Sequence, residues 1–448
     1  MNLKDKKISI IGAVRSGIGA AKLAKRSGAV PFVSDSGELT KLTDSVETLK
    51  AVDIEFEIGN HTEKVFECDL IIVSPGVPSD SEILKKAQEK KIKIVSEIEF
   101  ASWFCKGNII GITGTNGKTT TTDLCGYLFN KCGKKAYTAG NIGSAFSEIT
   151  DSVMENEFVS LEMSSFQLDF IDRFKPKVGM ILNITPDHLN RYDNKVEKYA
   201  ISKQRIYENQ NSDDFLILNK DSELLIRYLK NTKSKVYYFS TKSIVQSGCF
   251  IENNIVKFID NGNEKFSCKR EDILLRGEHN LQNAMAVIIA AKIFELDNDK
   301  ITDALRSYIG VPHRLELVRE IDGVKFINDS KATNVDSVWY ALQSFDEPIF
   351  LILGGQDKGN DYSLIEPLVI EKVKKIYAIG SSAETVFNYF HKNVKVEIKK
   401  DLEEVINFAI NETRSGDVVL LSPACASFDM FNNYEHRGDV FKQLVINL

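Results

Sequence analysis

The chain has 448 residues, of which 43% are hydrophobic and 27% are charged, and 63 acidic against 57 basic residues give a formal net charge of −6. At roughly 150 residues per domain this length predicts two or three domains, and the composition excludes a disordered or low-complexity chain. A dominant nucleic-acid-binding or anionic-membrane-binding surface requires an excess of positive charge, so neither is expected. No apolar run reaches the roughly 18 residues of a membrane-spanning helix.

The cysteines and the N-terminal residues bear on the cellular compartment. The seven cysteines are odd in number and include no C-x-x-C pair, so neither a disulfide framework nor a zinc site is indicated. Basic residues precede a short apolar run at residues 8–14, but the run ends at Arg15 and no small-residue cleavage pattern follows. We therefore expect reduced thiols in a cytoplasmic protein.

Short apolar segments of β type alternate with helical segments in three successive sections of the chain, a pattern typical of parallel α/β sheets. The predicted fold is α/β with three domains. They are a Rossmann-like N-terminal domain, a central P-loop ATPase-like domain with a mostly parallel sheet, and a Rossmann-like C-terminal domain. The predicted boundaries are residues 1–97, 98–311 and 312–448.

The elements follow in chain order. The first section predicts strands at residues 7–12, 31–35, 70–74 and 93–95, and helices at 18–26 and 81–90. The second predicts strands at 108–113, 158–162 and 178–184, antiparallel β structure over 235–270, a long helix at 280–294 and a linker at 307–312. The third predicts strands at 325–328, 349–353, 375–379 and 417–421.

A glycine-rich loop lies between the predicted strand at 108–113 and the helix after it. Such a loop presents backbone N–H groups to phosphate oxygens, a lysine reaches the outer phosphates, and a threonine hydroxyl ligates Mg²⁺. Because Ile112 stands where the usual spacing has glycine, the loop is a variant P-loop. A glycine-rich helix cap is the alternative. The predicted ATP-binding residues of the loop are Gly114, Thr115, Asn116, Gly117, Lys118, Thr119 and Thr120.

Two polar clusters end the next predicted strands of this section. Glu162 follows an apolar strand directly, and His188 follows the strand after it. Loops at the carboxyl ends of parallel strands share one crevice, so we expect both side chains to converge on the P-loop. A carboxylate beside an imidazole suits Mg²⁺ near phosphates, although His188 taken alone is a helix cap or core histidine. Lys203, on a predicted helix, is by composition an ordinary solvated lysine.

Other polar residues are placed where a ligand is expected. Asn280 and Asn283 share one helix face and suit a purine edge, while capping of the helix by Asn280 is the alternative. In the third section, strand-end loops offer donors to an anionic group: Arg314, Lys331, Lys358 and Ser427. In the first section, residues 12–19 form an incomplete dinucleotide fingerprint whose helix N-terminus suits the pyrophosphate of a nucleotide sugar.

Over its whole length the chain resembles the Mur ligase family, and within it the D-glutamate-adding branch of bacterial cell-wall synthesis. The motifs that carry this resemblance are residues 114–120 (GTNGKTT), 161–168 (LEMSSFQL), 185–192 (TPDHLNRY), 277–283 (GEHNLQN), 312–314 (PHR), 328–334 (NDSKATN) and 421–438 (LSPACASFDMFNNYEHRG). The last two are the most specific for this branch. The Asp-Asn-Pro-Arg motif of the diaminopimelate-adding branch is absent.

The resemblance implies roles for single residues. Lys118, Glu162, His188 and Lys203 would be catalytic, and Thr119, Glu162, His188 and Lys203 would hold two Mg²⁺ ions, with Lys203 carbamylated. Asn280 and Asn283 would face the adenine of ATP, Asp329 its ribose and Arg314 its phosphates. The residues implied around the substrates are Arg15, Ser16, Asp35, Ser36 and Gly76 at the UDP group, Asn141 and Ser164 near the reacting carboxylate, and Lys331, Thr333, Lys358, Ser427, Phe428 and Tyr434 around D-glutamate.

The implied reaction joins D-glutamate to UDP-N-acetylmuramoyl-L-alanine at the expense of ATP, in a monomer with no nucleic acid and no membrane insertion. Selectivity for D- over L-glutamate rests on the resemblance alone, and domain closure is expected on binding. A folylpolyglutamate synthase shares the ATP loop but lacks a UDP-holding first domain. A P-loop switch protein is the alternative of another class, suggested by Asn219-Lys220-Asp221, although Ser222 breaks its N-K-x-D motif.

Overall fold

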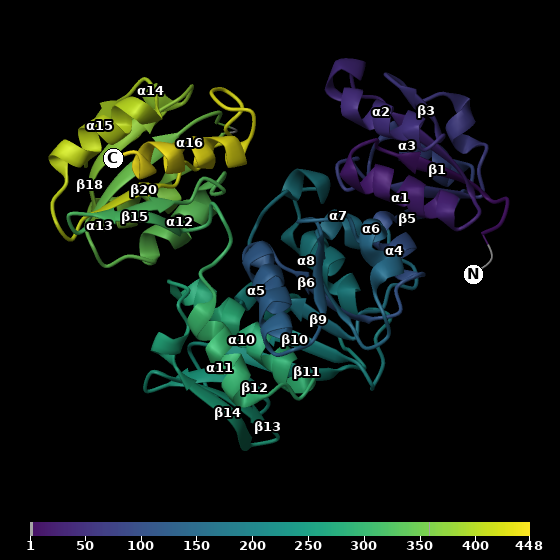
Figure 1. The fold of residues 1–448 in the computed structure, drawn as a ribbon, viewed down its shortest axis with the longest axis horizontal. Coiled ribbons are helices and arrows are strands. Elements are labelled where there is room, and N and C mark those ends of the chain that lie inside the picture. The colour runs from purple at the N-terminus through teal and green to yellow at the C-terminus, as the bar shows by residue number, and fades with distance from the viewer. Residues whose placement is uncertain (1–2, 358) are drawn as a thin grey trace. The chain divides into compact units, whose positions relative to one another are not determined.

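The structure is a computed structural model that describes residues 3–357 and 359–448. The chain divides into two compact units. The first runs to Asp272 and includes Gln282–Arg306, and the second consists of Ile273–Leu281 and Ser307–Leu448. Figure 1 shows three sheets, each with helices around it. Lys358, a predicted D-glutamate ligand, lies outside the described residues.

The N-terminal sheet belongs to the first unit and is entirely parallel, with strand order β3-β2-β1-β4-β5. The predicted Rossmann-like sheet is confirmed, and its order changes direction between β1 and β4. Every residue of β4 is buried, which explains its uninterrupted apolar sequence. The elements are β1 (Lys7–Ile11), α1 (Arg15–Arg26), β2 (Val30–Asp35), α2 (Thr43–Ala51), β3 (Glu55–Ile58), β4 (Leu70–Val73), α3 (Glu82–Glu89), β5 (Ile94–Ser96) and α4 (Glu97–Ser102).

The central sheet, also in the first unit, has nine strands in the order β14-β13-β12-β11-β10-β9-β6-β8-β7. Its strands are β6 (Asn108–Thr113), β7 (Ala136–Gly140), β8 (Phe158–Glu162), β9 (Val178–Ile181), β10 (Phe215–Asn219), β11 (Lys235–Ser240), β12 (Gly248–Glu252), β13 (Ile255–Asp260) and β14 (Asn263–Lys269). Its helices are α5 (Lys118–Lys131), α6 (Phe146–Ile149), α7 (Ser165–Leu168), α8 (Val196–Gln204), α9 (Glu223–Tyr228), α10 (Glu278–Ile293) and α11 (Asn298–Ser307).

Two expectations for this section need correction. The antiparallel structure expected over residues 235–270 is confirmed for β12, β13 and β14, but β11 pairs in parallel with both β10 and β12. The strand expected over 178–184 ends at Ile181, because Asn183 turns to bond the P-loop. The long apolar helix is confirmed as α10, and residues 284–291 are all buried.

The third sheet belongs to the second unit and has the order β15-β16-β20-β17-β18-β19. All its pairings are parallel except that of β15 with β16, so the Rossmann-like prediction is confirmed. The elements are β15 (Glu316–Ile321), β16 (Val324–Asn328), α12 (Val335–Gln343), β17 (Ile349–Gly354), α13 (Glu366–Lys372), β18 (Val373–Ile379), α14 (Ala383–Phe390), β19 (Lys395–Ile398), α15 (Leu402–Glu412), β20 (Val418–Leu421) and α16 (Tyr434–Ile446).

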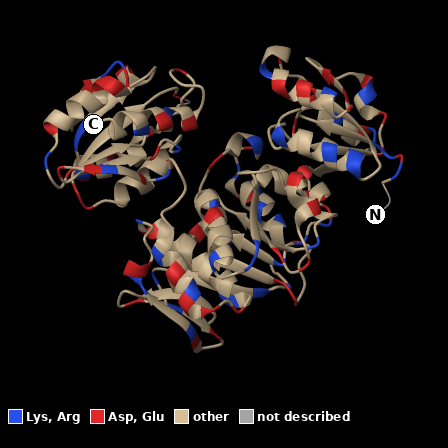
Figure 2. Ribbon diagram, in the orientation of Figure 1, with Lys and Arg blue, Asp and Glu red and all other residues tan. Residues whose placement is uncertain are grey.

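Charged residues of both signs are interspersed along every section of the ribbon, in keeping with the modest net charge (Figure 2). In the described part of the chain, no helix is long and apolar enough to cross a membrane. All seven cysteines lie in that part and are free thiols, as expected.

Candidate active site

The P-loop begins where β6 ends and leads directly into α5. The Lys118 ammonium folds back over the loop and donates to the carbonyl oxygens of Gly114, at 2.9 Å, and Thr115, at 2.7 Å. Asn183, at the end of the neighbouring strand, fixes the loop from the side. Its Oδ1 accepts from the backbone N–H groups of Thr115 and Asn116, at 3.1 and 2.9 Å. The loop is therefore held in shape by a side chain of another strand.

Gly117 is the residue before α5 and has φ of +83°, which glycine adopts without strain. A Cβ at this position would lie 2.5 Å from Oδ1 of Asn283, on α10. The structure thus places Asn283 directly against the P-loop. Asn280 lies inside the helix and donates to the carbonyl oxygen of Arg276, at 2.8 Å, so it is not the helix cap.

Glu162 reaches the same edge of the sheet, because it ends β8 opposite Ile112, just before the P-loop. Its side chain is only 2% exposed. Oε1 accepts from Nδ2 of Asn141 at 3.1 Å. Gly140, with φ of +105°, allows this approach, since a Cβ there would lie 2.3 Å from the carbonyl oxygen of Glu162.

His188 follows β9 and adopts a left-handed backbone conformation, with φ of +51°. The ring lies edge-on to Phe166 at 5.3 Å, and Nε2 is 3.6 Å from Oδ2 of Asp187. Partial burial lowers the pKa of His188, Asp187 opposes the shift, and the positive charges of Lys203 and Lys118 add to it. The imidazole is therefore neutral at pH 7, the form that can ligate a metal ion.

Lys203, on α8, is 1% exposed, so its interpretation as an ordinary solvated lysine is wrong. Its Nζ donates to the Gly114 carbonyl oxygen at 2.8 Å and lies 4.5 Å from the centre of the Tyr199 ring. Burial holds the pKa of Lys203 well below its usual value, and the charge of Lys118 lowers it further. A buried amine beside the P-loop is the kind of perturbed group that marks functional sites.

Buried polar atoms around the loops lack partners among the described residues. They are Oε2 of Glu162, Nδ2 of Asn116 and Oγ1 of Thr185. An unpaired buried carboxylate oxygen is costly unless a cation or donor meets it, and an oxygen ligand suits Mg²⁺. Within residues 3–357 and 359–448 no cluster of three or more His, Cys, Asp or Glu side chains forms, so a metal ion here would need hydroxyl, water or phosphate oxygens as well.

Ser164, predicted near the reacting carboxylate, caps the short helix α7. Its Oγ accepts from the backbone N–H of Gln167 at 3.3 Å, and its own N–H donates to Oε1 of Gln167. The structure therefore brings Ser164, Asn141 and Glu162 to neighbouring strand ends of the central sheet, and Thr119 and Thr120 are buried at the start of α5.

A cavity of about 800 Å³ opens at the carboxyl ends of β1 and β4, where the N-terminal sheet changes direction. In open α/β sheets this switch point is where ligands bind. The Asp35 carboxylate shapes one wall by accepting from the N–H groups of Ala13 and Gly37, both at 2.7 Å. All five residues predicted near the UDP group line this single cavity: Arg15, Ser16, Asp35, Ser36 and Gly76.

Asp329, in the second unit, is 5% exposed and lies at the end of β16. Burial raises the pKa of Asp329 to about 7, against the opposing effects of the Ser422 hydrogen bond and of Arg314. Ser422 Oγ donates to Oδ2 at 2.8 Å. His279, at the start of α10, is also in this unit, and burial with the charge of Arg314 lowers its pKa to about 4.

The residues predicted around D-glutamate also lie on strand-end loops of the second unit. Nζ of Lys331 lies 5.2 Å from the centre of the Tyr434 ring. Ser427 is buried, Thr333 is exposed, and the Phe428 ring is 67% exposed. The structure therefore pairs Lys331 with Tyr434 and leaves Phe428 open to solvent.

Two residues that hold strand-end loops in place by hydrogen bonds were not predicted. Asn183 braces the P-loop, and Arg437, 1% exposed, ties two strand-end loops of the second unit together. Its guanidinium donates to Oγ and the carbonyl oxygen of Ser330, at 2.9 and 2.7 Å, and to the carbonyl oxygen of Cys425 at 3.1 Å. The available signals were a polar residue just beyond an apolar strand and an arginine on the buried face of a terminal helix.

Fold and site together define an α/β protein with a P-loop, a nucleotide-sized cavity at a sheet switch point and a separate Rossmann-like unit. Family models agree with this class. The Mur ligase middle domain matches residues 112–291, the Mur ligase glutamate ligase domain matches residues 313–425, and the MurD N-terminal domain matches residues 7–83. The chain belongs to the Mur ligase family, whose members are ATP-dependent ligases.

Curated relatives match the chain over its full length. The UDP-N-acetylmuramoylalanine--D-glutamate ligase of Chloroherpeton thalassium is 44% identical over 100% of this chain and 99% of its own. That of Christiangramia forsetii is 44% identical over 99% and 100%. Among solved structures, UDP-N-acetylmuramate-alanine ligase from Thermotoga maritima superposes with a TM-score of 0.62 at 19% identity, over 99% of both chains, which supports the fold.

Proposed function

We propose that this ligase joins D-glutamate to UDP-N-acetylmuramoyl-L-alanine at the expense of ATP, giving UDP-N-acetylmuramoyl-L-alanyl-D-glutamate, ADP and phosphate in peptidoglycan precursor synthesis. Full-length relatives with this activity in their names support the substrates. The structural observation that carries the proposal is the meeting of Lys118, Glu162 and the buried Lys203 at the end of β6.

The chemistry explains the need for ATP. A carboxylate does not acylate an amine at neutral pH, because oxide would have to leave. An oxygen of the L-alanyl carboxylate attacks the γ-phosphorus, the bond from this phosphorus to the β-phosphate oxygen breaks, and the products of this step are an acyl phosphate and ADP. The neutral amine of D-glutamate then attacks the acyl carbon, loses a proton, and phosphate departs from the tetrahedral intermediate. Positioning and charge neutralisation carry most of such catalysis.

We assign the phosphates to the P-loop. The N–H groups of residues 114–120 and the start of α5 suit phosphate oxygens, and Lys118, now bonded to loop carbonyls, is placed to turn toward the transferred phosphate. Thr119, Glu162, His188 and Lys203 would hold two Mg²⁺ ions. Magnesium so held would neutralise phosphate charge, and the unpartnered Oε2 of Glu162 fits that role.

We further propose that Lys203 is carbamylated. The neutral Nζ amine adds to CO₂, forming an N–C bond and releasing one proton, so that the side chain ends in a carboxylate. Two observations support this: the amine is buried beside a second cation, and its pKa is strongly lowered. The positive charge of Lys118 disfavours a second positive charge on Lys203. The same charge would stabilise the negatively charged carbamate at that position.

Substrate assignments follow the remaining sites. We place the UDP group in the cavity of the N-terminal sheet, where Arg15 also donates to the Gly143 carbonyl oxygen at 2.6 Å. We place the adenine near Asn280 and Asn283, the ribose and phosphates near Asp329 and Arg314, and D-glutamate near Lys331, Thr333, Ser427, Phe428 and Tyr434. Lys358 joins this last group by sequence alone.

We also propose a cytoplasmic monomer with domain boundaries at residues 97 and 311. A nucleotide-linked substrate and ATP are both cytoplasmic compounds, which supports the compartment. Sedimentation velocity at micromolar concentration measures the oligomeric state, and a dimer peak would contradict the monomer.

The deciding experiment measures phosphate release from ATP with UDP-N-acetylmuramoyl-L-alanine and either D- or L-glutamate, each component omitted in turn. We expect release only when both substrates are present, and only with the D-isomer. Release without either substrate would identify a general ATPase instead, and equal release with L-glutamate would refute the assigned stereochemistry.

A further inference from the structure

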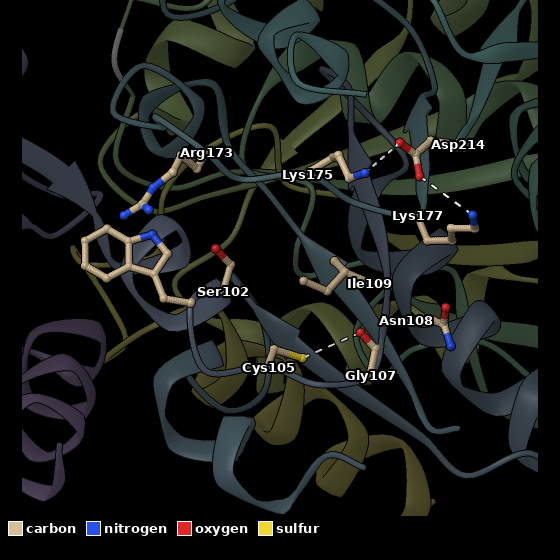
Figure 3. A pocket seen from close by; sticks show the side chains of 10 residues that line it. Ser102, Cys105, Gly107, Asn108, Ile109, Arg173, Lys175, Lys177 and Asp214 are labelled. Atoms are coloured by element: carbon tan, nitrogen blue, oxygen red, sulfur yellow. Dashed lines mark hydrogen bonds and ion pairs between the residues drawn. The ribbon is translucent and has the colours of Figure 1, made fainter. Parts of the chain in front are cut away.

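A second cavity, of about 530 Å³, opens at the amino ends of the central strands (Figure 3). Its lining comes from residues 102–109 before and within the start of β6, from residues 173–177 before β9, and from Asp214 before β10. The P-loop lies at the other end of β6. With a rise of about 3.3 Å per residue, the six-residue strand separates the two sites by roughly 20 Å.

The cavity carries an excess of positive charge. Arg173, Lys175 and Lys177 line it together with a single carboxylate, that of Asp214. Lys175 Nζ is 3.3 Å from Oδ2 and Lys177 Nζ is 3.8 Å from Oδ1 of this buried carboxylate. One negative charge thus faces three positive ones. Figure 3 shows Arg173 on one side of the cavity and the two lysines with Asp214 on the other.

The other nearby acids reduce this excess without removing it. Asp172 contacts Arg173 at 3.5 Å, but it also pairs with Lys93, at 2.5 Å. Glu99 is fully buried: Oε1 accepts from Nε1 of Trp103, and Oε2 accepts from the backbone N–H groups of residues 172, 173 and 174. These donors are neutral, so Glu99 keeps its negative charge, and a net positive charge remains once Lys93 is counted with the three cations of the lining.

The same bonds of Glu99 make the cavity rigid. They join the segment that carries Trp103 to the segment that carries Arg173, and the Arg173 guanidinium lies 5.2 Å from the centre of the indole ring. Ile109 adds an apolar surface beside these groups. The cavity therefore combines cations with an apolar wall, and its volume is in the usual range for small-molecule sites of about 300–1,000 Å³.

We propose that this cavity binds a small phosphomonoester, with its phosphate between Arg173 and Lys175 and its organic group against Trp103 and Ile109. A phosphomonoester carries about −1.5 to −2 charges at pH 7, opposite in sign to the net charge of the cavity. The volume exceeds what phosphate alone fills. Hydrogen bonds between charged donors and phosphate oxygens supply the affinity. The site is distinct from those assigned to ATP and to the UDP group.

The test uses the fluorescence of Trp103, since the chain has only one other tryptophan, Trp339, which Trp339→Phe removes. Phenyl phosphate is titrated at constant ionic strength, with a saturating non-hydrolysable ATP analogue present to fill the P-loop. Benzoate, which has the same ring and one charge, is the matched ligand. We expect saturable quenching by phenyl phosphate and at least about tenfold weaker binding of benzoate.

Lys175→Gln is expected to weaken phenyl phosphate binding by about tenfold or more, because it removes one charged donor. Lys106→Gln is the matched control. Lys106 is an exposed lysine of the same loop as Cys105 and does not line the cavity, so binding should not change. Both variants should retain normal phosphate release from ATP, which shows that the fold and the ligase reaction are intact.

Three results would overturn the proposal. They are a quenching signal that does not saturate, equal affinity in the Lys175→Gln and Lys106→Gln variants, and benzoate binding as tight as that of phenyl phosphate. In a fourth case, quenching that appears only when the ATP analogue is left out would place the ligand at the P-loop. None of these readouts depends on the substrates assigned above, so the two proposals fail separately.

Discussion

Lys118 and Lys203 show how the surroundings of a lysine determine its chemical role. Both donate to the Gly114 carbonyl oxygen, at 2.9 and 2.8 Å. Lys118 is half-buried at the mouth of the loop, whereas Lys203 is enclosed and its pKa is far below the usual value. The first is suited to remain a cation facing phosphate, and the second is suited to react as a neutral amine.

We predict that Lys118→Ala lowers kcat by more than about 10²–10³-fold, the usual cost of removing a single stabilising donor, because in the proposed mechanism Lys118 meets both bound ATP and the developing charge. Phosphate release at saturating substrates measures the effect. Lys131→Ala, at the exposed end of the same helix, should leave kcat unchanged. Near-normal turnover of Lys118→Ala would remove Lys118 from the mechanism.

Asp329 predicts a dependence of stability on pH. Its pKa rises from a usual 3.8 to about 7 on folding, so the folded state binds the proton more tightly between these pH values. Stability from this group is therefore present at low pH and is lost as pH rises to about 7, by on the order of 4 kcal/mol. Asp329→Asn cannot titrate and should lack this loss.

Urea unfolding at pH 4, 6 and 8 measures the difference, followed by Trp339, which lies in the same unit, in a Trp103→Phe background. The Asp329→Asn protein should lose less stability than its parent between pH 4 and 8. Asp346→Asn changes an exposed carboxylate of the same unit and should follow the parent. Identical slopes in all three proteins would contradict the raised pKa.

At the scale of elements, α5 is flanked by two glycines with the same φ angle, Gly117 just before it and Gly133 just beyond its C-cap. Gly117 and Gly133 both have φ of +83°, but only at Gly117 would a Cβ meet another side chain, Asn283 at 2.5 Å. We predict that both alanine variants lose about 1 kcal/mol of stability through the left-handed conformation. Only Gly117→Ala should also lose ATP affinity, by at least tenfold, in equilibrium binding of an ATP analogue. Equal affinities would show that the Gly117–Asn283 contact is not needed.

The elements also show what a single sequence can predict. Central strands such as β4 and β17 were found because they are buried throughout and therefore uninterrupted in apolar residues. The edge strands β3, β15 and β19 were not found, because edge positions alternate charged and apolar side chains and keep much of their length exposed.

Candidate site residues could be predicted from the sequence where they lie at the end of a predicted strand. They could not be predicted where their properties depend on burial by distant parts of the chain. The P-loop follows β6 and Glu162 ends β8, so the sheet alone brings these two together, while His188 lies in the loop after the neighbouring strand β9. The burial of Lys203 and the three bonds of Arg437 depend on partners far away in the chain, which no local pattern encodes. For Lys203 only the family resemblance indicated a special role.

At the scale of the whole molecule, the N-terminal cavity and the central sheet are joined by Arg15, which lines the cavity and bonds the loop after Asn141. Binding energy from a remote group can position a reacting one. We predict that N-acetylmuramoyl-L-alanine without UDP lowers kcat/KM by at least about 10³-fold, measured by phosphate release over a range of acceptor concentrations. Comparable kcat/KM for the two acceptors would mean that the cavity does not hold the UDP group.

Gly140, where a Cβ would lie 2.3 Å from the carbonyl oxygen of Glu162, has a consequence for antibacterial resistance. A compound that contacts an exchangeable side chain is escaped by a single replacement. A side chain at Gly117 would displace Asn283, and one at Gly140 would displace the backbone of Glu162. Substitutions at these two positions that would escape an inhibitor bonded to their backbone therefore also disturb the site itself.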